Sequence, residues 1–332
     1  ELGDLGRQAA VAEDPETKVA LHLQAADVWE QRIGEPDGAR ASYEAVLEAD
    51  ALHERAFTAL EALHREAARW DELSALYVAR HDKLAEDGNV AEAVPFMVRA
   101  AKVFDTELGD REQAFAAAQI AFEEDVTNPE AIAALEAITG ASSKWNDLLK
   151  TTMESYTAEP AGPRKTQLGL HAAKWYGLEL GHPEWAIPIY TQILAAEPGN
   201  LHALRSQGEL YRRLGQWQPL AKTLQRAVEV ARSPEDRRAA HVQLGEVYEK
   251  SLKQPAQAVE QFHSALAIDA TDGAALAALA LVHAAAEDWP ALVEVLRRHV
   301  ASVTDPAEAA ELRMRVGSVL EDRIGDLEGA AA

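Results

Sequence analysis

Cysteine is absent from the 332-residue sequence, and basic side chains and aromatic rings are scarce. Without cysteine the chain has no disulfide, no thiolate zinc site and no thiol nucleophile. The 32 basic residues are outnumbered by 55 acidic ones, which gives a net charge of −23 at pH 7. Nucleic acids and anionic membranes are bound through basic surfaces, which this composition does not provide. We therefore expect neither of them as a partner.

Long apolar runs are missing too, since no stretch approaches the ~20 residues that cross a bilayer. The eleven histidines are scattered, none in H-E-x-x-H, and the sequence has no G-x-G-x-x-G, Walker loop or G-x-S-x-G. We expect no catalytic residue, no metal site and no cofactor. The sequence leaves the compartment open: we expect a soluble protein without membrane insertion, with the cytoplasm favoured over the periplasm.

What the sequence does contain is a period of 72 residues. Tryptophans open the motif W-x-x-L at intervals of 75, 72 and 72 residues: Trp70, Trp145, Trp217 and Trp289. Turn positions recur at matching intervals: Gly34, Gly109, Gly181, Lys253 and Gly325. Independent sets of positions that share one period indicate internal repeats. The three extra residues of the first interval are expected in the loop around Glu86 to Asn89.

Within each period the apolar residues have helical spacing. Leu244, Val247, Tyr248 and Leu252 form one such stripe. The turn glycines are typical of helix ends, and prolines two residues later suit the first turn of a new helix. Each period therefore predicts four helices, or two helix pairs of about 35 residues.

Two stretches carry a more specific pattern. They are His241-x2-Leu244-Gly245-x2-Tyr248 followed by Ala258-x3-Phe262, and Leu204-x2-Gln207-Gly208-x2-Tyr211. The pattern resembles the tetratricopeptide repeat. The resemblance implies an all-α fold, an α-solenoid (superhelix) of stacked antiparallel helix pairs. We expect one solenoid over residues 1–332, with four full 72-residue double repeats and partial repeats at both ends, as an internal fragment of a longer array.

The resemblance also implies a function. Proteins of this family are scaffolds, so we expect a non-catalytic protein that binds protein or peptide partners along its groove, in a multiprotein assembly. The alternative is a regulatory or substrate-recruiting arm of a larger enzyme whose catalytic domain lies outside these residues. Both need the same solenoid, so the sequence does not separate them.

The tryptophans divide into two groups. Those of W-x-x-L recur with the fold, so we expect them to be buried between neighbouring helices. Trp175 replaces valine at its repeat position, which predicts an enlarged core residue. Trp185 replaces small or polar residues, which predicts an exposed contact residue; packing under the preceding loop is the alternative.

Charge is uneven along the chain. Residues 1–150 carry 31 acids and 14 bases, whereas residues 201–250 carry 9 bases and 6 acids. The resemblance implies that the first helix of each pair lines the groove, which places several cations there. The candidate partner-binding residues are Trp185, His171, Lys174, Arg205, Arg212, Arg213, Arg238 and Lys250. They could bind an acidic peptide; the alternative, which the pattern favours, is a solvated helix face with internal ion pairs.

Overall fold

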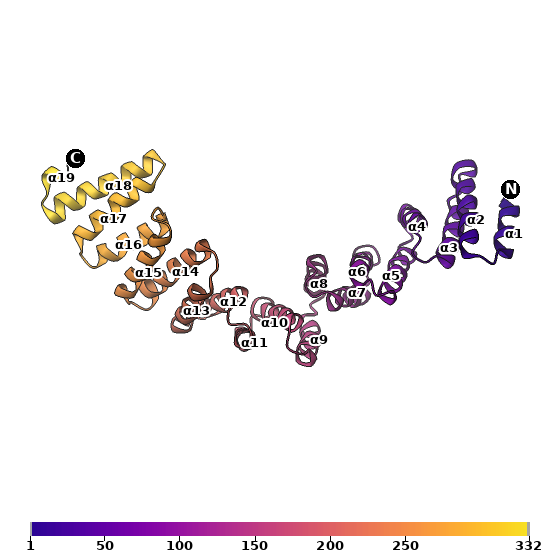
Figure 1. The fold of residues 1–332 in the computed structure, drawn as a ribbon, viewed down its shortest axis with the longest axis horizontal. Helices are drawn as coiled ribbons and strands as arrows, with labels where there is room; N and C mark the ends of the chain where they lie inside the picture. Colours follow the sequence, from indigo (N-terminus) through magenta and orange to yellow (C-terminus); the bar gives the residue numbers. More distant parts are fainter. Residues whose placement is uncertain (1, 331–332) are drawn as a thin grey trace. The chain divides into compact units, whose positions relative to one another are not determined.

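The computed structural model describes residues 2–330, and along this range the chain is helical with no strand (Figure 1). The predicted all-α solenoid of stacked helix pairs is confirmed. The chain divides into two compact units, Glu1–Leu168 and Gly169–Ala332, which are described separately.

In the first unit, helices α1 to α9 pack in chain order, each against the next. Their bounds are α1 (Leu2–Val11), α2 (Pro15–Val28), α3 (Pro36–Ala49), α4 (Glu54–Glu66), α5 (Trp70–Glu86), α6 (Val90–Thr106), α7 (Arg111–Glu124), α8 (Pro129–Ser142) and α9 (Trp145–Ala158). Helix α10 (Pro163–Lys174) contains the boundary between the units.

In the second unit, helices α11 to α19 follow the same rule. Their bounds are α11 (Pro183–Ala196), α12 (Leu201–Arg213), α13 (Trp217–Val230), α14 (Pro234–Glu246), α15 (Pro255–Ile268), α16 (Gly273–Ala285), α17 (Trp289–Ser302), α18 (Pro306–Val319) and α19 (Leu327–Ala330). Across both units, the first helix of four helix pairs ends in a π-helical turn. These turns are η1 (Trp29–Ile33) after α2, η2 (Trp175–Glu179) after α10, η3 (Val247–Ser251) after α14 and η4 (Leu320–Ile324) after α18.

The helices begin and end where short polar side chains and glycines direct them. Asp14 accepts a hydrogen bond from the backbone N–H of Thr17 at 2.9 Å, and Asn200 does the same for Ala203 at 3.0 Å. These side chains satisfy amide donors that a helix start leaves unpaired. At the other end, Gly34 has a left-handed φ of 75°. Glycine takes that conformation without the steric cost of a Cβ.

A second left-handed turn recurs just before each W-x-x-L tryptophan. It is formed by Ala68, Ser143, Gly215 and Glu287, all with positive φ. Only one of these residues is glycine, so the sequence pattern did not reveal this turn. Its recurrence at the period of the repeat shows that packing of the flanking helices imposes it on residues that do not favour it.

The location predicted for the three extra residues is wrong. Helix α5 has 17 residues, whereas α9, α13 and α17 have 14 each. The loop after α5 is only Asp87–Asn89, no longer than its counterparts. The extra residues therefore extend α5 by almost one turn. Leu84, in the extended part of the helix, is buried in the core.

The W-x-x-L motif is buried mainly through its leucine. Leu73, Leu148, Leu220 and Leu292 are fully buried, whereas the four tryptophans are only partly buried. Trp217 and Trp289 pack against the edge of the core of the second unit. The predicted structural role agrees with this position, but the expected degree of burial was too high. Trp175 is completely buried, as predicted.

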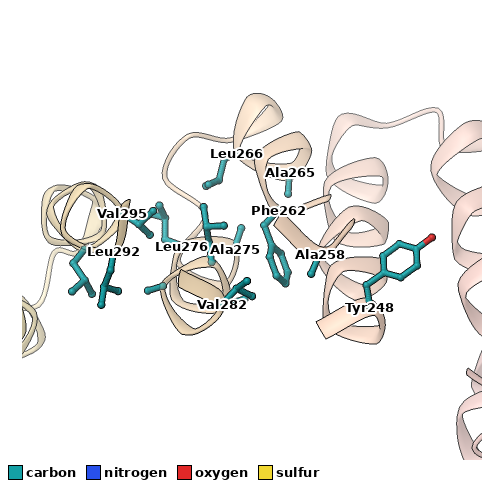
Figure 2. Packing of buried hydrophobic residues seen from close by; sticks show 14 of the residues in the cluster. Tyr248, Ala258, Phe262, Ala265, Leu266, Ala275, Leu276, Val282, Leu292 and Val295 are labelled. Atoms are coloured by element: carbon teal, nitrogen blue, oxygen red, sulfur yellow. The ribbon is translucent and has the colours of Figure 1, made fainter. Parts of the chain in front are cut away.

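The core of the second unit is apolar from α13 to α18. Figure 2 shows the part of it from η3 to α17. Phe262 lies at its centre against Gly245, where an added Cβ would come within 2.5 Å of the ring. Leu276 and Leu296 belong to the same cluster and are almost completely buried. The small residue of the family pattern thus makes room for the aromatic ring of the next helix.

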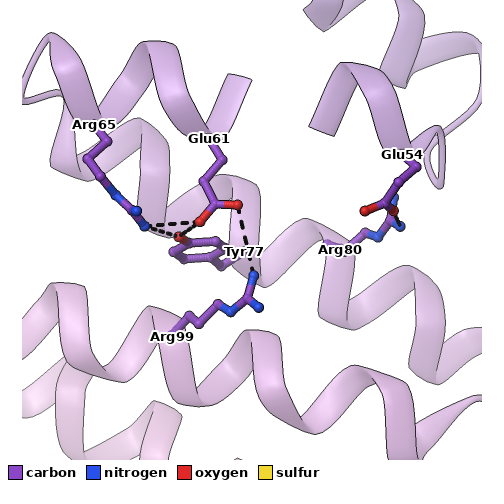
Figure 3. Close-up of polar contacts among 6 residues, drawn as sticks. All are labelled: Glu54, Glu61, Arg65, Tyr77, Arg80 and Arg99. Atoms are coloured by element: carbon purple, nitrogen blue, oxygen red, sulfur yellow. Dashed lines mark hydrogen bonds and ion pairs between the residues drawn. The ribbon is translucent and has the colours of Figure 1, made fainter. Parts of the chain in front are cut away.

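The first unit contains a polar layer between α4, α5 and α6 (Figure 3). Tyr77 donates a hydrogen bond to Glu61 at 2.7 Å and accepts one from Arg65 at 3.1 Å. Burial, reinforced by Glu61, raises the pKa of Tyr77 to about 12. Arg99 approaches Glu61 at 3.9 Å from α6.

Arg80 lies in the same layer and is only 9% exposed. Its guanidinium is 4.9 Å from the ring centre of Phe57 and 5.7 Å from that of Phe96. One nitrogen donates to Glu54 at 2.6 Å, while Nε and the other Nη are buried without a hydrogen-bond partner. Ring faces therefore provide much of the compensation for burying this charge.

Candidate functional site

A hollow of about 440 Å³ lies in the second unit between the end of α10, η2 and α12; we call it the inner hollow. Its floor is apolar, with Leu178, Tyr190 and Leu210, and Leu178 is 46% exposed. Residues of α12 three and four positions apart face it, because such residues share one side of a helix. Its charged rim consists of Lys174, Arg205, Glu209 and Arg213.

The arginines on α12 are paired with acids of the same chain. Arg205 forms an ion pair with Asp236 on α14. The pKa of Asp236 is lowered by the hydroxyl of Ser233 first and by Arg205 second. Arg213 and Arg212 both donate to Glu209, at 3.3 and 3.1 Å. The alternative of internal ion pairs is therefore realised, and an acidic partner would have to compete with these carboxylates.

The predicted binding residues do not form one cluster. The inner hollow brings together Lys174, Arg205 and Arg213. Arg212 lines a smaller hollow of about 240 Å³ toward α13, which Arg205 also lines. The ring of His171 stacks on Trp175 at 5.6 Å, away from the lining of the inner hollow.

Two further predicted cations have structural partners. Arg238 pairs with Asp272, whose buried carboxylate also caps α16 by accepting from Ala275 N–H at 2.8 Å. Lys250 pairs with Glu246 one turn earlier at 2.8 Å. Removing Arg238 would leave the carboxylate of Asp272 without its countercharge, so this arginine supports the fold whatever else it contacts.

Trp185 is 49% exposed, which agrees with the predicted exposure. It is separate from the inner hollow: the ring of His182 stacks on it at 4.0 Å, and Tyr176 meets it edge-on at 5.5 Å. At the same repeat position in the first unit is Gly38, where the ring of Trp29 occupies the space that a Cβ would need. Trp185 thus packs locally through one face and presents the other to solvent.

A related hollow of about 300 Å³ lies in the first unit between α6 and α8. Its lining residues stand 72 positions before those of the inner hollow: Lys102 corresponds to Lys174, Ala133 to Arg205 and Ile138 to Leu210. The repeat therefore produces the same hollow twice with different rims. Sequence reasoning missed this hollow, although comparing equivalent positions for small residues could have revealed it.

Among residues 2–330, no three His, Asp or Glu side chains are grouped so that they could hold a metal ion. In the same range no helix is both long and apolar enough to span a membrane.

Comparison with known proteins identifies the repeats. The model of the tetratricopeptide repeat family matches residues 203–238 and 275–310, which begin 72 residues apart. The first match contains most of α12 and all of α13, and the second contains most of α16 and all of α17. Residues 203–238 and 275–310 are therefore tetratricopeptide repeats.

Several solved structures are similar at low sequence identity. MamA from Desulfovibrio magneticus RS-1 is 20% identical over 52% of this chain and 92% of that one, with a TM-score of 0.39. PilF from Pseudomonas aeruginosa is 19% identical over 72% and 89%, with a TM-score of 0.37. Cut9 in its APC/C complex with Hcn1 is 15% identical over 92% and 57%, with a TM-score of 0.36. No curated protein matches the sequence.

Proposed function

We propose that this chain is a non-catalytic scaffold that binds a protein partner through the inner hollow. The observation that carries the proposal is an apolar floor, exposed at Leu178, together with a charged rim on α10 and α12. The presence of tetratricopeptide repeats, a family of interaction scaffolds, supports the same function. No group with a catalytic role is part of the proposal.

The shape and chemistry of the hollow favour a particular kind of partner segment. An apolar side chain that covered Leu178 would gain about 25 cal/mol for each Å² of apolar surface removed from water. Acidic groups of the partner on either side of this anchor would then contact Lys174. They would also replace Asp236 as the ion-pair partner of Arg205, or Glu209 as that of Arg213. We therefore propose an extended or helical segment with one apolar anchor and acidic neighbours.

The test is capture of partners on the immobilised chain, followed by titration of the partner with variants of the floor. Leu178→Asp places a charge where the anchor would lie, and we expect an affinity loss of about tenfold or more. Leu214→Asp is the matched control, because Leu214 follows the last residue of α12 and is 43% exposed but does not line the hollow. Equal affinities of the two variants would place the binding surface elsewhere.

Trp185→Ala is a second arm of this experiment. Half of the indole is exposed, so its loss should leave the melting temperature nearly unchanged. Reduced affinity at unchanged melting temperature would extend the contact surface to the start of α11. Unchanged affinity would restrict Trp185 to its packing against His182 and Tyr176.

A further inference from the structure

A second hollow in the same unit lies between α11, α12 and α13 and measures about 530 Å³; we call it the outer hollow. It is lined by other residues of α12 than those of the inner hollow. Most of its lining can donate or share hydrogen bonds: Thr191, Gln207, Tyr211, Gln218, Lys222 and Arg226. No carboxylate is among the lining residues, although the chain as a whole carries a net charge of −23.

The two cations of the outer hollow differ from those of the inner one in their partners. Lys222 has no ion-pair partner among residues 2–330. Arg226 donates to the backbone carbonyl of Leu194 at 3.3 Å and has no carboxylate within ion-pair distance in the same range. The positive charge of this hollow is therefore available to a ligand, whereas Arg205 and Arg213 are already neutralised.

One lining residue departs from the repeat in a way that the fold does not require. Gln207 is only 5% exposed, yet its repeat position holds Leu60, Leu135 and Leu279 elsewhere, all buried. Its amide donates to the hydroxyl of Thr191 at 2.9 Å. A leucine would fill this core position without the cost of burying an amide.

The surface residues of the outer hollow also differ from their counterparts one period earlier, because acidic side chains are missing. In α9, one period earlier, Asp147 and Glu154 hold the positions of Pro219 and Arg226. Lys150 in α9 corresponds to Lys222 and is similarly exposed. The two acids that flank Lys150 along its helix have thus been replaced around Lys222, which makes α13 locally positive.

We propose that the outer hollow binds a phosphate monoester, presented by a phosphorylated side chain of a partner protein. Lysine and arginine form charge-assisted hydrogen bonds with phosphate oxygens, and neutral hydroxyl and amide donors complete such a site. No carboxylate lines the hollow, so the charged side chains of its wall are positive although the chain as a whole is acidic. This inference is independent of the proposed function, which concerns the inner hollow.

The experiment is a titration of the whole chain, followed by NMR of backbone and side-chain amides, at constant pH and ionic strength. The probes are inorganic phosphate, a short phosphoserine peptide and the same peptide without phosphate. We expect shifts at the side-chain amides of Gln207 and Gln218 with both phosphate probes and none with the plain peptide. Lys222→Gln should weaken phosphate binding about fivefold or more.

Lys150→Gln is the matched control, because it removes an equivalent lysine from a helix that keeps its acids. Arg226→Lys, which retains the charge, should bind phosphate more tightly than Arg226→Gln. A free phosphate metabolite is indicated instead if the peptide binds more weakly than inorganic phosphate. The proposal is overturned if neither phosphate probe shifts these amides, or if Lys222→Gln and Lys150→Gln weaken binding equally.

Discussion

The same three-helix junction is built in two ways in this molecule. In the second unit, α16 and α17 meet α18 through apolar side chains, and Leu276 and Leu296 are almost completely buried. Figure 2 shows Leu276 of α16 and Val295 of α17. Three periods earlier in the sequence, α4 and α5 meet α6 through a hydrogen-bonded and aromatic layer (Figure 3). The equivalent positions are Phe57 and Leu276, Glu61 and Ala280, Tyr77 and Leu296, and Arg80 and His299.

The difference shows what the repeat requires and what it leaves free. Both junctions keep their helices in the same order. The apolar version is non-directional, so it tolerates adjustment of neighbouring side chains. The polar version pairs Tyr77 with Glu61 and Arg65, so a shifted helix would leave the carboxylate of Glu61 without these partners. We infer that the polar junction fixes the relative positions of α4, α5 and α6 more strictly than an apolar junction would, and that it contributes less to the free energy of unfolding.

The largest expected effect is in the apolar junction. Leu296→Ala removes a fully buried side chain that the surrounding helices cannot fill, so unfolding should become easier by about 2–5 kcal/mol. Urea titration gives the loss, and native-state hydrogen exchange should locate it in α16 to α18, because contacts are between neighbours. Loss of protection spread equally over α2 to α6 would contradict this local response.

Alkaline pH should separate the two junctions. The fold raises the pKa of Tyr77 to about 12, so the protonated tyrosine is stabilised below pH ~10 and this stabilisation is lost as the pH rises through about 12. The loss would reach about 2–3 kcal/mol. Tyr77→Phe should flatten the alkaline part of the stability profile measured by urea unfolding. A profile identical to that of the original chain would show that another group causes the alkaline sensitivity.

The smallest change is expected from making the polar junction apolar. Arg80→Met keeps much of the side-chain length, removes two unpaired buried nitrogens and leaves Glu54, which is exposed, in water. Unfolding free energy should therefore stay within about 1 kcal/mol of the original or rise. Thermal and urea unfolding provide the measurement. A loss above about 3 kcal/mol would mean that the contacts with Phe57 and Phe96 outweigh desolvation.

Sequence reasoning predicted the fold because the information is periodic. Equivalent residues such as Leu73 and Leu220 repeat the same environment, so each period supports the others. It failed where contacts with neighbouring helices determine the local backbone conformation. The left-handed turn at Ala68 and the extension of α5 at Leu84 depend on packing and have no local pattern. That residues 1–332 form one continuous solenoid within a longer array stays a prediction.

The candidate site was predictable only in part. Spacing placed Arg205, Arg212 and Arg213 on one face, but the inner hollow is lined by Arg205 and Arg213 only, whereas Arg212 lines a different hollow. Arg213 pairs with Glu209 on its own helix, α12, whereas Arg205 pairs with Asp236 on α14. Counting charges along the sequence does not identify the pair between two helices. The outer hollow was invisible to a search for clustered charge, because its distinctive residue, Gln207, is buried and neutral.

The recurrence of tryptophan at the first position of α13 and of α17 has a consequence for how the gene could change. Excision of the 72 codons from Trp217 to Asp288 would join Gln216 to Trp289, and the helix after the junction would again start with W-x-x-L. Loss of a single codon inside α13 would instead rotate every later side chain of that helix by about 100°. Insertions and deletions in such a gene are therefore least disruptive when they are large and of one particular length.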